Sequence, residues 1–531
     1  MTSRGAPRSP RLLRSLGLGL ALVAFSAFSA FSAPALSAPP GKGHAPKKAG
    51  KGKAPKVVLV TTTREVPAPA PAAAPVTLNL PVKRVTLENG LRVVVDVDPT
   101  SPTVAIAVVY DVGSRDEERG QRGFAHLFEH LMFQGSQNVA KGDHVRLVAG
   151  HGGMLDGTTG VDRTSYFEKL PESELALGLW LEADRMRSLD VSAESFGSQR
   201  KVVEEEYRLR VSSAAYESSG IRLEELVYQG FWPYEHPTIG SLADLDGAEL
   251  PWVKAFHDHH YGPNDAVLAI AGDVDPEQAI ALAHRYFDAI PRIEAAPYHE
   301  VPLPEQTSQR TAIVKDDRAR TPGVLYGWAI PPARSPEHYA LTMAGVLLGD
   351  GESSRLHQLL VREKGLAQRV SAGAEGRRGP DLFRVEAVLA DGAKTADVER
   401  LVEGEIKALA TRGPSDAEME KARRQVEAGL VLGLQTNAAR ARKLGEYELC
   451  YGDAGLLAGE LPRYLAVTKD EVKRAVTQHL GPTRRTLVET VPADRADAVE
   501  KPVVKRAAAA APARVAPPAP KKAHGKHKKK P

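Results

Sequence analysis

The residues with the clearest chemical potential lie in one five-residue stretch, His126-Leu127-Phe128-Glu129-His130. On an α-helix, residues three and four positions apart share a face, so both imidazoles and the carboxylate would point into one small volume. Two imidazoles can bind a single metal ion, and the Glu129 carboxylate beside them can take a proton from a metal-bound water as a general base. The alternative is a pair of core histidines that bind backbone groups.

A third ligand is needed, because a catalytic zinc ion usually has three protein ligands and one water. The helix expected over Ser195–Val211 offers three consecutive glutamates, Glu204 to Glu206. The apolar residues of this helix are expected to mark its buried face, and at about 100° per residue Glu206 falls in the middle of that face. A carboxylate on a buried face needs a cation as its partner, which a metal ion provides. The apolar residues used are Val202, Val203 and Leu209.

One Zn²⁺ per chain is therefore predicted, while a solvated charged face is the alternative for the three glutamates. The predicted ligands are His126, His130 and Glu206, and the predicted catalytic residue is Glu129. A second polar group runs from His257 to His260, but four adjacent positions cannot all face one point on a helix, so no metal is expected there.

The elements that must position these residues alternate between strand and helix. Asn89-Gly90 separates two short apolar segments, a pattern typical of a hairpin with a tight type I′ turn, in which both turn residues have positive φ. Two blocks of roughly 200 residues, each mixing strands and helices, predict a duplicated α+β unit. The expected strands are Arg84–Leu87, Leu91–Val97, Val104–Tyr110, Ala266–Ala271 and Gly323–Ile330, and the expected helices include 123–133, 172–189, 195–211, 338–348 and 417–431.

Both ends of the chain differ in composition from its middle. Four arginines before position 15, an apolar stretch to about Phe31 and small residues through Ala38 predict a signal peptide over residues 1–38 and a periplasmic or secreted protein. A membrane-spanning helix is the alternative. Residues 39–80 are rich in Pro, Ala and Lys and are expected to form an extended linker, and residues 496–531 a basic disordered tail.

The composition limits the class of protein. A single cysteine, Cys450, excludes an intrachain disulfide and a zinc site made of thiolates. Among the 531 residues, 42% are hydrophobic and 26% charged, and no second long apolar run follows the N-terminal one, so we expect no span in the mature protein. The whole chain has a net charge of +4, but residues 81–500 carry −16, and nucleic acid is not expected as a ligand because phosphate binding needs a basic surface.

The motif and its surroundings resemble the pitrilysin-like, or inverzincin, zinc metallopeptidases of peptidase family M16, in particular the bacterial two-domain type similar to the subunits of mitochondrial processing peptidase. The family pattern is His-x-x-Glu-His followed by a zinc-binding Glu about 76 residues later, and Glu206 lies 76 residues after His130. The resemblance covers roughly residues 81–495. Other similar segments are Gly152–Tyr166, Ala183–Met186, His236–Gly240, Tyr261–Asn264, Ala271–Val274, Gly349–Leu356 and Arg362–Leu366.

This resemblance implies two homologous α+β domains, each a mostly antiparallel sheet flanked by helices. Residues 81–300 would form the catalytic zinc-binding domain, and residues 301–495 a homologous non-catalytic domain. Members with four such domains enclose unfolded peptides in a clam-like chamber, so this two-domain chain would need a homologous partner chain, identical or different. A peptide would pair with an edge strand near Met154–Thr159. The substrate-binding residues predicted there are Asp156, Gly157 and Thr158.

Two features depart from the family pattern. Asp156 stands where many members have an Asn that contacts the substrate backbone. Fully active members also use an Arg and a Tyr from the opposite half, whereas the corresponding region here, Arg377–Lys394, contains Arg378 and Arg384 but no Tyr. The missing pair suggests a heterodimer in which a silent homologue supplies it.

Two functions are considered first, and a structural envelope protein with basic tethers is a third possibility. The first is a zinc-dependent endopeptidase that hydrolyses unfolded peptides or small proteins through a metal-activated water. The second is a catalytically idle or partner-dependent binding or assembly subunit of a heterodimeric peptidase. The intact five-residue motif favours the first.

Overall fold

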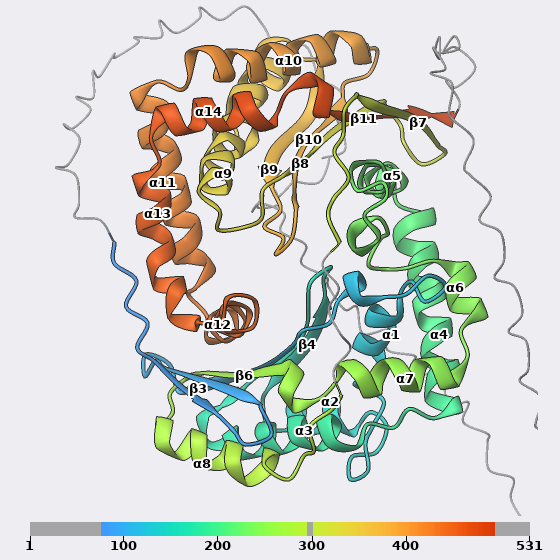
Figure 1. Cartoon of the computed structure of the whole chain (residues 1–531), viewed down its shortest axis with the longest axis vertical. Helices are drawn as coiled ribbons and strands as arrows, with labels where there is room; N and C mark the ends of the chain where they lie inside the picture. The colour runs from blue at the N-terminus through green and yellow to red at the C-terminus, as the bar shows by residue number, and fades with distance from the viewer. Residues whose placement is uncertain (1–75, 295–300, 494–531) are drawn as a thin grey trace, which may run out of the picture.

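The computed structural model describes residues 76–294 and 301–493 of the chain. The predicted signal peptide, nearly all of the predicted linker and the predicted basic tail lie outside these residues. Two mixed β-sheets flanked by helices make up the described part, which confirms the predicted α+β class (Figure 1). No helix in the two described ranges is both long and apolar enough to cross a membrane.

The first sheet has the strand order β1-β2-β6-β3-β5-β4, so β4 lies at an edge. Neighbouring strands are antiparallel, except that β2 and β6 run parallel. The central strand β3 is an almost continuous apolar run that is buried along nearly its whole length, as expected for a strand covered on both faces. The strands are β1 (Val82–Thr86), β2 (Arg92–Val97), β3 (Thr103–Tyr110), β4 (Met154–Thr159), β5 (Thr164–Pro171) and β6 (Ala266–Gly272).

The second sheet has the strand order β7-β11-β8-β10-β9. It begins with a parallel pair, β7 and β11, and continues with three antiparallel pairs. The first sheet shows the same sequence of pairings from β2 to β4, so the two sheets share one topology, as a duplicated unit requires. The strands are β7 (Arg310–Asp316), β8 (Gly323–Ile330), β9 (Ala367–Ala374), β10 (Asp381–Leu389) and β11 (Thr486–Pro492).

One face of each sheet is covered by helices that come from the same part of the chain as the sheet itself. Alternate residues of β3 pack with α1, α3 and α8 in the core of the first sheet, and α9, α10 and α14 pack against the second sheet. The first group is α1 (Phe124–Leu131), α2 (Asp143–Gly150), α3 (Leu175–Ser188), α4 (Ala193–Tyr207), α6 (Leu242–Gly247), α7 (Leu250–His260) and α8 (Pro276–Phe287). The second is α9 (Pro336–Gly349), α10 (Thr395–Arg412), α11 (Asp416–Gly433), α13 (Glu460–Ala466) and α14 (Lys469–His479).

The opposite face of each sheet is covered by a helix from the other part of the chain. Helix α12 (Asn437–Tyr451) lies across β3 and β6 of the first sheet, and α5 (Glu217–Val227) packs on β8 and β11 of the second (Figure 1). Small residues of β3 and β6 face α12, and Gly445 of α12 sits where an added Cβ would lie 2.7 Å from Val109. This exchange of helices joins the two sheets into one molecule.

The predicted hairpin is present as β1 and β2, but the predicted type I′ turn is wrong. Only Gly90 of the Asn-Gly pair has a positive φ. The Asn89 amide instead donates to the carbonyl oxygens of Phe287 and Ile290, and its Oδ1 accepts from the N–H of Leu91. Asn89 therefore ties the turn to the end of α8.

Candidate metal centre

Helix α1 presents the His-x-x-Glu-His residues from a buried position. His126 and Glu129 are buried and His130 is half-buried, while the apolar residues of α1 pack into the core of the first sheet. The Glu117 carboxylate accepts hydrogen bonds from two N–H groups at the start of α1. A carboxylate at this end also complements the helix dipole, so Glu117 fixes the direction in which α1 enters the site.

Helix α4 brings Glu206 to the two imidazoles, but only Val203 of the three apolar residues used to predict this lies on the buried face. Val202 and Leu209 are 45% and 59% exposed, so neither marks the buried face. The buried stripe instead recurs at intervals of three and four residues, which places its members on one face of the helix. The stripe consists of Phe196, Gln199, Val203 and the largely buried Glu206.

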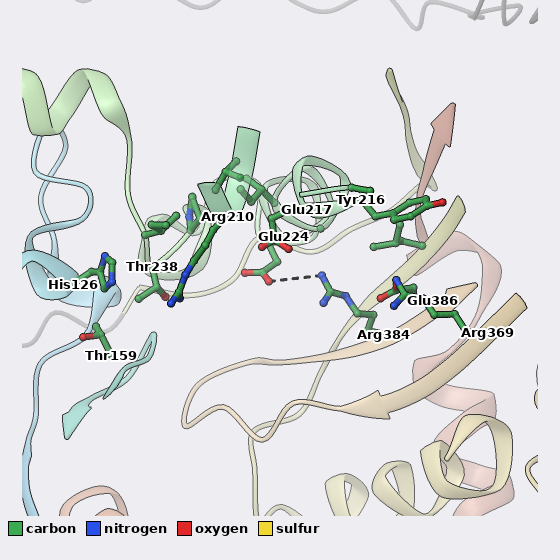
Figure 2. A pocket seen from close by; sticks show the side chains of 17 residues that line it. His126, Thr159, Arg210, Tyr216, Glu217, Glu224, Thr238, Arg369, Arg384 and Glu386 are labelled. Carbon is green, nitrogen blue, oxygen red and sulfur yellow. Dashed lines mark hydrogen bonds and ion pairs between the residues drawn. The ribbon is translucent and has the colours of Figure 1, made fainter. Parts of the chain in front are cut away.

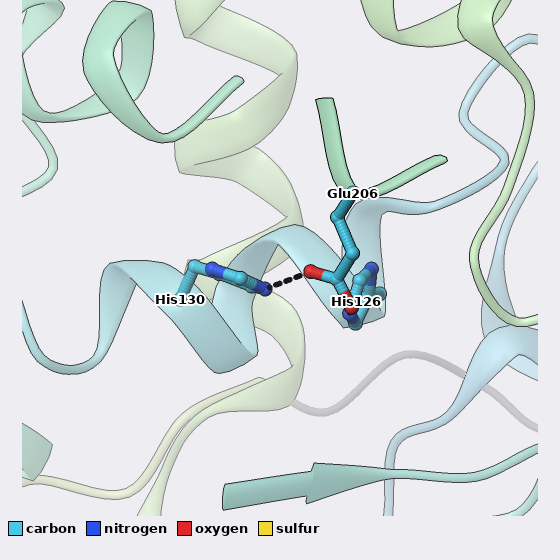
Figure 3. Close-up of side chains that lie close together, drawn as sticks. All are labelled: His126, His130 and Glu206. Carbon is cyan, nitrogen blue, oxygen red and sulfur yellow. Dashed lines mark ion pairs between the residues drawn. The ribbon is translucent and has the colours of Figure 1, made fainter. Parts of the chain in front are cut away.

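The three predicted ligands converge on one small volume (Figure 3). The Nε2 atom of His130 lies 3.2 Å from one carboxylate oxygen of Glu206, and that of His126 lies 3.7 Å from the other. One ligand atom from each residue falls within 4.8 Å of the other two. The glutamate thus bridges two imidazoles that α1 carries one turn apart.

The protonation states of these groups fit a divalent metal ion. Burial lowers the pKa of His126 to about 3, so its imidazole is neutral, as a metal ligand requires. Burial alone would raise the pKa of Glu206, but the hydrogen bond to His130 and nearby charges lower it, which keeps the carboxylate ionised. Two imidazoles and one carboxylate form a donor set that zinc binds in catalytic sites. Arg210 approaches Glu206 from the same helical segment, with its Nε 3.0 Å from Oε1.

Glu129 lies beside the three ligands and is held from the edge strand. Burial raises the pKa of its carboxyl to about 7. The Thr159 hydroxyl on β4 donates a 2.7 Å hydrogen bond to Glu129 Oε2. Gly157 leaves room for this carboxylate, because an added Cβ would lie 3.0 Å from Glu129 Cγ. A group that titrates near neutral pH can both accept and donate a proton.

The three residues predicted to bind substrate lie on β4 but face in different directions. Gly157, like Thr159, is on the face that contacts Glu129, whereas Asp156 and Thr158 alternate with them and are half-buried on the opposite face. Burial raises the pKa of Asp156, whose Oδ1 accepts a hydrogen bond from the Gly157 N–H. Only Gly157 of the three therefore contacts the group that we predict to be catalytic.

A cavity of about 420 Å³ adjoins the centre and extends toward the second sheet (Figure 2). Arg384 of β10 lies on its wall, with its guanidinium 4.0 Å from Glu224 of α5. The labelled residues along the wall are His126, Thr159, Arg210, Tyr216, Glu217, Glu224, Thr238, Arg369, Arg384 and Glu386. Charged side chains of the second sheet and of the segment after α4 thus share one space with His126.

Arg378 and Arg384, the arginines of the region that lacks the family's Tyr, occupy different places. Arg384 lines the cavity, but the Arg378 guanidinium lies 2.8 Å from Asp111, and the backbone N–H of Arg378 donates to Asp162. Arg378 therefore holds the second sheet to the first.

A second group of potential ligands lies deep in the first core. His144, Glu168 and Glu182 are all buried with ligand atoms close together. The guanidinium of Arg185 forms an ion pair with Glu182, so this group already contains its own cation. Sequence reasoning missed this cluster, as it missed Thr159 and Arg210, because each depends on contacts between separate elements.

Comparison with known families identifies the chain. The family model described as insulinase, peptidase family M16, matches residues 92–228, and the model described as the peptidase M16 inactive domain matches residues 251–426. The chain belongs to peptidase family M16. The first match contains all four residues of the candidate centre, and the second begins at α7 and covers most of the second sheet.

Curated relatives in the M16 family carry protease names. The zinc protease PqqE of Helicobacter pylori is 29% identical over 415 residues, which cover 76% of this chain and 91% of that protein. An uncharacterised zinc protease of Mycobacterium bovis is 31% identical over 420 residues, covering 78% and 92%. This M16 chain is thus similar to zinc proteases over nearly their whole length.

Solved M16 structures share the fold. A protease from Helicobacter pylori matches with a TM-score of 0.74 and 27% identity, covering 78% of this chain and all of that one. The periplasmic protease PqqL of Escherichia coli matches with a TM-score of 0.65 and 18% identity, covering 80% of this chain but 49% of that one. The two-sheet unit described here therefore corresponds to about half of the PqqL chain.

Proposed function

We propose that this chain is a zinc-dependent endopeptidase that hydrolyses unfolded peptides or small proteins. The observation that carries the proposal is the convergence of His126, His130 and Glu206, with Glu129 beside them and anchored to an edge strand. The protease names of relatives that match over most of their length support the same reaction class.

The roles proposed for the residues follow from their positions. His126, His130 and Glu206 would hold one zinc ion, which when bound supplies the Lewis acidity that makes water nucleophilic near neutral pH. Glu129 accepts the proton of the attacking water and returns it to the leaving amine. Its pKa of about 7 suits both transfers.

The substrate is proposed to bind as an added strand. β4 is an edge strand, so its outer backbone groups are available to an extended peptide. Main-chain hydrogen bonds there need no particular side chains, which is consistent with unfolded peptides as substrates. The cavity beside His126 offers space for a side chain that projects from such a strand.

The proposed domain organisation follows the sequence. Residues 1–38 would direct export to the periplasm or outside the cell, and PqqL, a structural neighbour, carries the description periplasmic. Residues 81–300 would form the catalytic domain and 301–495 its non-catalytic homologue, although α5 and α12 each pack on the sheet of the other domain. A homologous partner chain is proposed because the chain corresponds to about half of PqqL.

The second candidate is a partner-dependent subunit, which the match to an inactive-domain model over residues 251–426 favours for the second half of the chain. One experiment separates the two functions. The full chain, purified alone, is incubated with a mixture of unstructured peptides, cleavage is read by mass spectrometry, and zinc content is measured on the same preparation.

Glu129→Gln is the test variant, and Glu205→Gln, an exposed glutamate on α4, is its matched control. We expect cleavage by the wild type and by the control, and none by Glu129→Gln with zinc retained. Absence of cleavage by the wild type with zinc bound would favour the partner-dependent subunit. Absence of both cleavage and zinc would overturn the site.

A further inference from the structure

Helix α12 delivers one arginine from the second half of the chain to the edge strand of the first sheet. The Arg442 guanidinium carbon lies 4.3 Å from the centre of the Phe167 ring on β5. Its Nη2 lies 3.5 Å from the Thr158 hydroxyl on β4. Arg442 thus reaches the outermost strand on the face opposite Glu129.

The charge of Arg442 has no close carboxylate partner. Among the residues that the structure describes, no carboxylate oxygen lies within 4.0 Å of its guanidinium nitrogens. Neighbouring arginines differ, since Arg163 pairs with Glu446 at 2.7 Å and Arg440 with Asp96 and Asp98. Burial and the nearby Arg163 lower the pKa of Arg442, and the charges of Asp156 and Glu446, which raise it, offset this only in part.

Geometry places a bound peptide within reach of this cation. A strand added to the open edge of β4 would run about 4.8 Å from it, with its side chains alternating between the two faces. Side chains on one face would meet Glu129, Gly157 and Thr159. Those on the other would lie beside Thr158 and Asp156, where a peptide carboxylate could form a charge-assisted hydrogen bond with Arg442.

We infer that Arg442 selects substrates with an acidic side chain, Asp or Glu, at one position close to the cleaved bond. The inference rests on the proposed function, because it assumes that peptides bind along β4. Asp156 lies two residues from Thr158 on the same face, so a second acid two positions away would meet a carboxylate instead of a cation. The preferred substrate therefore carries one acid on this face, not a run of acids.

Cleavage kinetics test the preference. In an unstructured peptide with one cleavage site, a single Glu, Gln or Lys is moved one residue at a time past the cleaved bond, and kcat/KM is measured. We expect a preference of about tenfold for Glu over Gln at one position, on the scale of one charge-assisted hydrogen bond. Arg442→Gln should abolish the preference without abolishing cleavage of the Gln peptide. Equal rates for Glu and Gln at every position would overturn the inference.

Two further variants separate a role in recognition from a role in folding. Arg442→Lys keeps a positive charge and should retain part of the preference, although its ammonium cannot form a bidentate pair. Arg424→Gln, on the exposed side of α11, is the matched control and should leave the preference unchanged. A preference that persists in Arg442→Gln would assign it to another residue.

Binding measurements separate this inference from the proposed function. Fluorescein-labelled Glu and Gln peptides are titrated with Glu129→Gln, alone and combined with Arg442→Gln, and anisotropy gives Kd. Tighter binding of the Glu peptide that requires Arg442, without cleavage by the wild type, would support the inference and refute the peptidase activity. Cleavage by the wild type with equal Kd values for both peptides would refute the inference alone.

Discussion

The Glu129 carboxylate is positioned by two elements that are distant in the sequence. Helix α1 carries it, and the Thr159 hydroxyl on β4 orients one of its oxygens through a 2.7 Å hydrogen bond. A proton-transfer group works best when its orientation is fixed before the reaction. The edge strand proposed to bind substrate therefore also aligns the residue proposed to act on it.

Thr159→Val should lower kcat by about tenfold, the effect of one lost hydrogen bond of about 1.4 kcal/mol. Thr159→Ser keeps the hydroxyl and should restore most of the rate. Zinc content, measured by atomic absorption, should be equal in all three proteins because Thr159 is not among the ligands. An unchanged kcat in Thr159→Val would show that the hydrogen bond does not orient Glu129.

Sequence spacing alone predicted how the residues of one helix lie relative to one another. It could not predict contacts between residues of different elements. The arrangement of His126, Glu129 and His130 follows from helical geometry alone. Glu206 lies beside the two imidazoles, but two of the three apolar residues used to select it, Val202 and Leu209, are exposed. A short amphipathic helix contains more than one plausible apolar stripe. Nothing local could place Thr159 or Arg442 beside the site.

Helix α12 can approach the first sheet closely because both surfaces are made of small residues. Gly445 faces Val109 of β3, and alanines line β3 and β6 beneath it. Such close packing tolerates little extra volume. The position of α12, and with it that of Arg442, therefore depends on one glycine.

Gly445→Val should destabilise the protein by about 1–3 kcal/mol through overpacking. Gly429→Ala, on the exposed side of α11 with no heavy atom within 4 Å of an added Cβ, is the control and should stabilise by about 0.5–1 kcal/mol through helix propensity. Urea unfolding followed by circular dichroism measures both effects. Equal stability of Gly445→Val and the wild type would mean that α12 can shift at no cost.

Most individual elements could be predicted from the sequence, but not which sheet each helix covers. β8 matches its predicted range, and α9 and α11 differ from theirs by one or two residues at each end. The exchange of α5 and α12 could not be predicted, because the apolar face of a helix is equally suited to either sheet. The predicted type I′ turn at Asn89 was wrong for a similar reason, because the Asn89 side chain donates to carbonyl oxygens at and just after the end of α8, far away in the sequence.

A buried charge network joins the two halves of the molecule. Arg378 from the second half meets Asp111 and Asp162 of the first, next to Arg115. Burial, together with the neighbouring Asp111 and Asp116, raises the pKa of Asp265 to about 7. The network therefore contains a carboxyl that the folded protein holds protonated at a pH where the unfolded chain releases the proton.

The sign of the effect on stability follows from this raised pKa. Between about pH 4 and pH 7 Asp265 carries a proton in the folded state but not in the unfolded state. The stability that this protonation contributes is therefore complete below about pH 4 and is lost as the pH rises through 7. Asp265→Asn removes this titration. Its Tm relative to the wild type should rise from pH 4 to pH 8, by about 2–4 °C.

Thermal unfolding at a series of pH values measures the difference, with Asp317→Asn, at an exposed position, as the control. The control should show the same difference from the wild type at every pH. A Tm difference for Asp265→Asn that is also constant with pH would contradict the raised pKa.

The exchanged helices also set an order of events during synthesis. The last strand of the first sheet ends at Gly272, but the helix that covers its second face begins at Asn437. At about 5–20 residues per second, the ribosome needs roughly ten to thirty seconds to make the intervening chain. For that time the alanine-rich face of the sheet lacks its cover, so a nascent chain paused before α12 should be a preferred target for chaperones that bind exposed apolar strands.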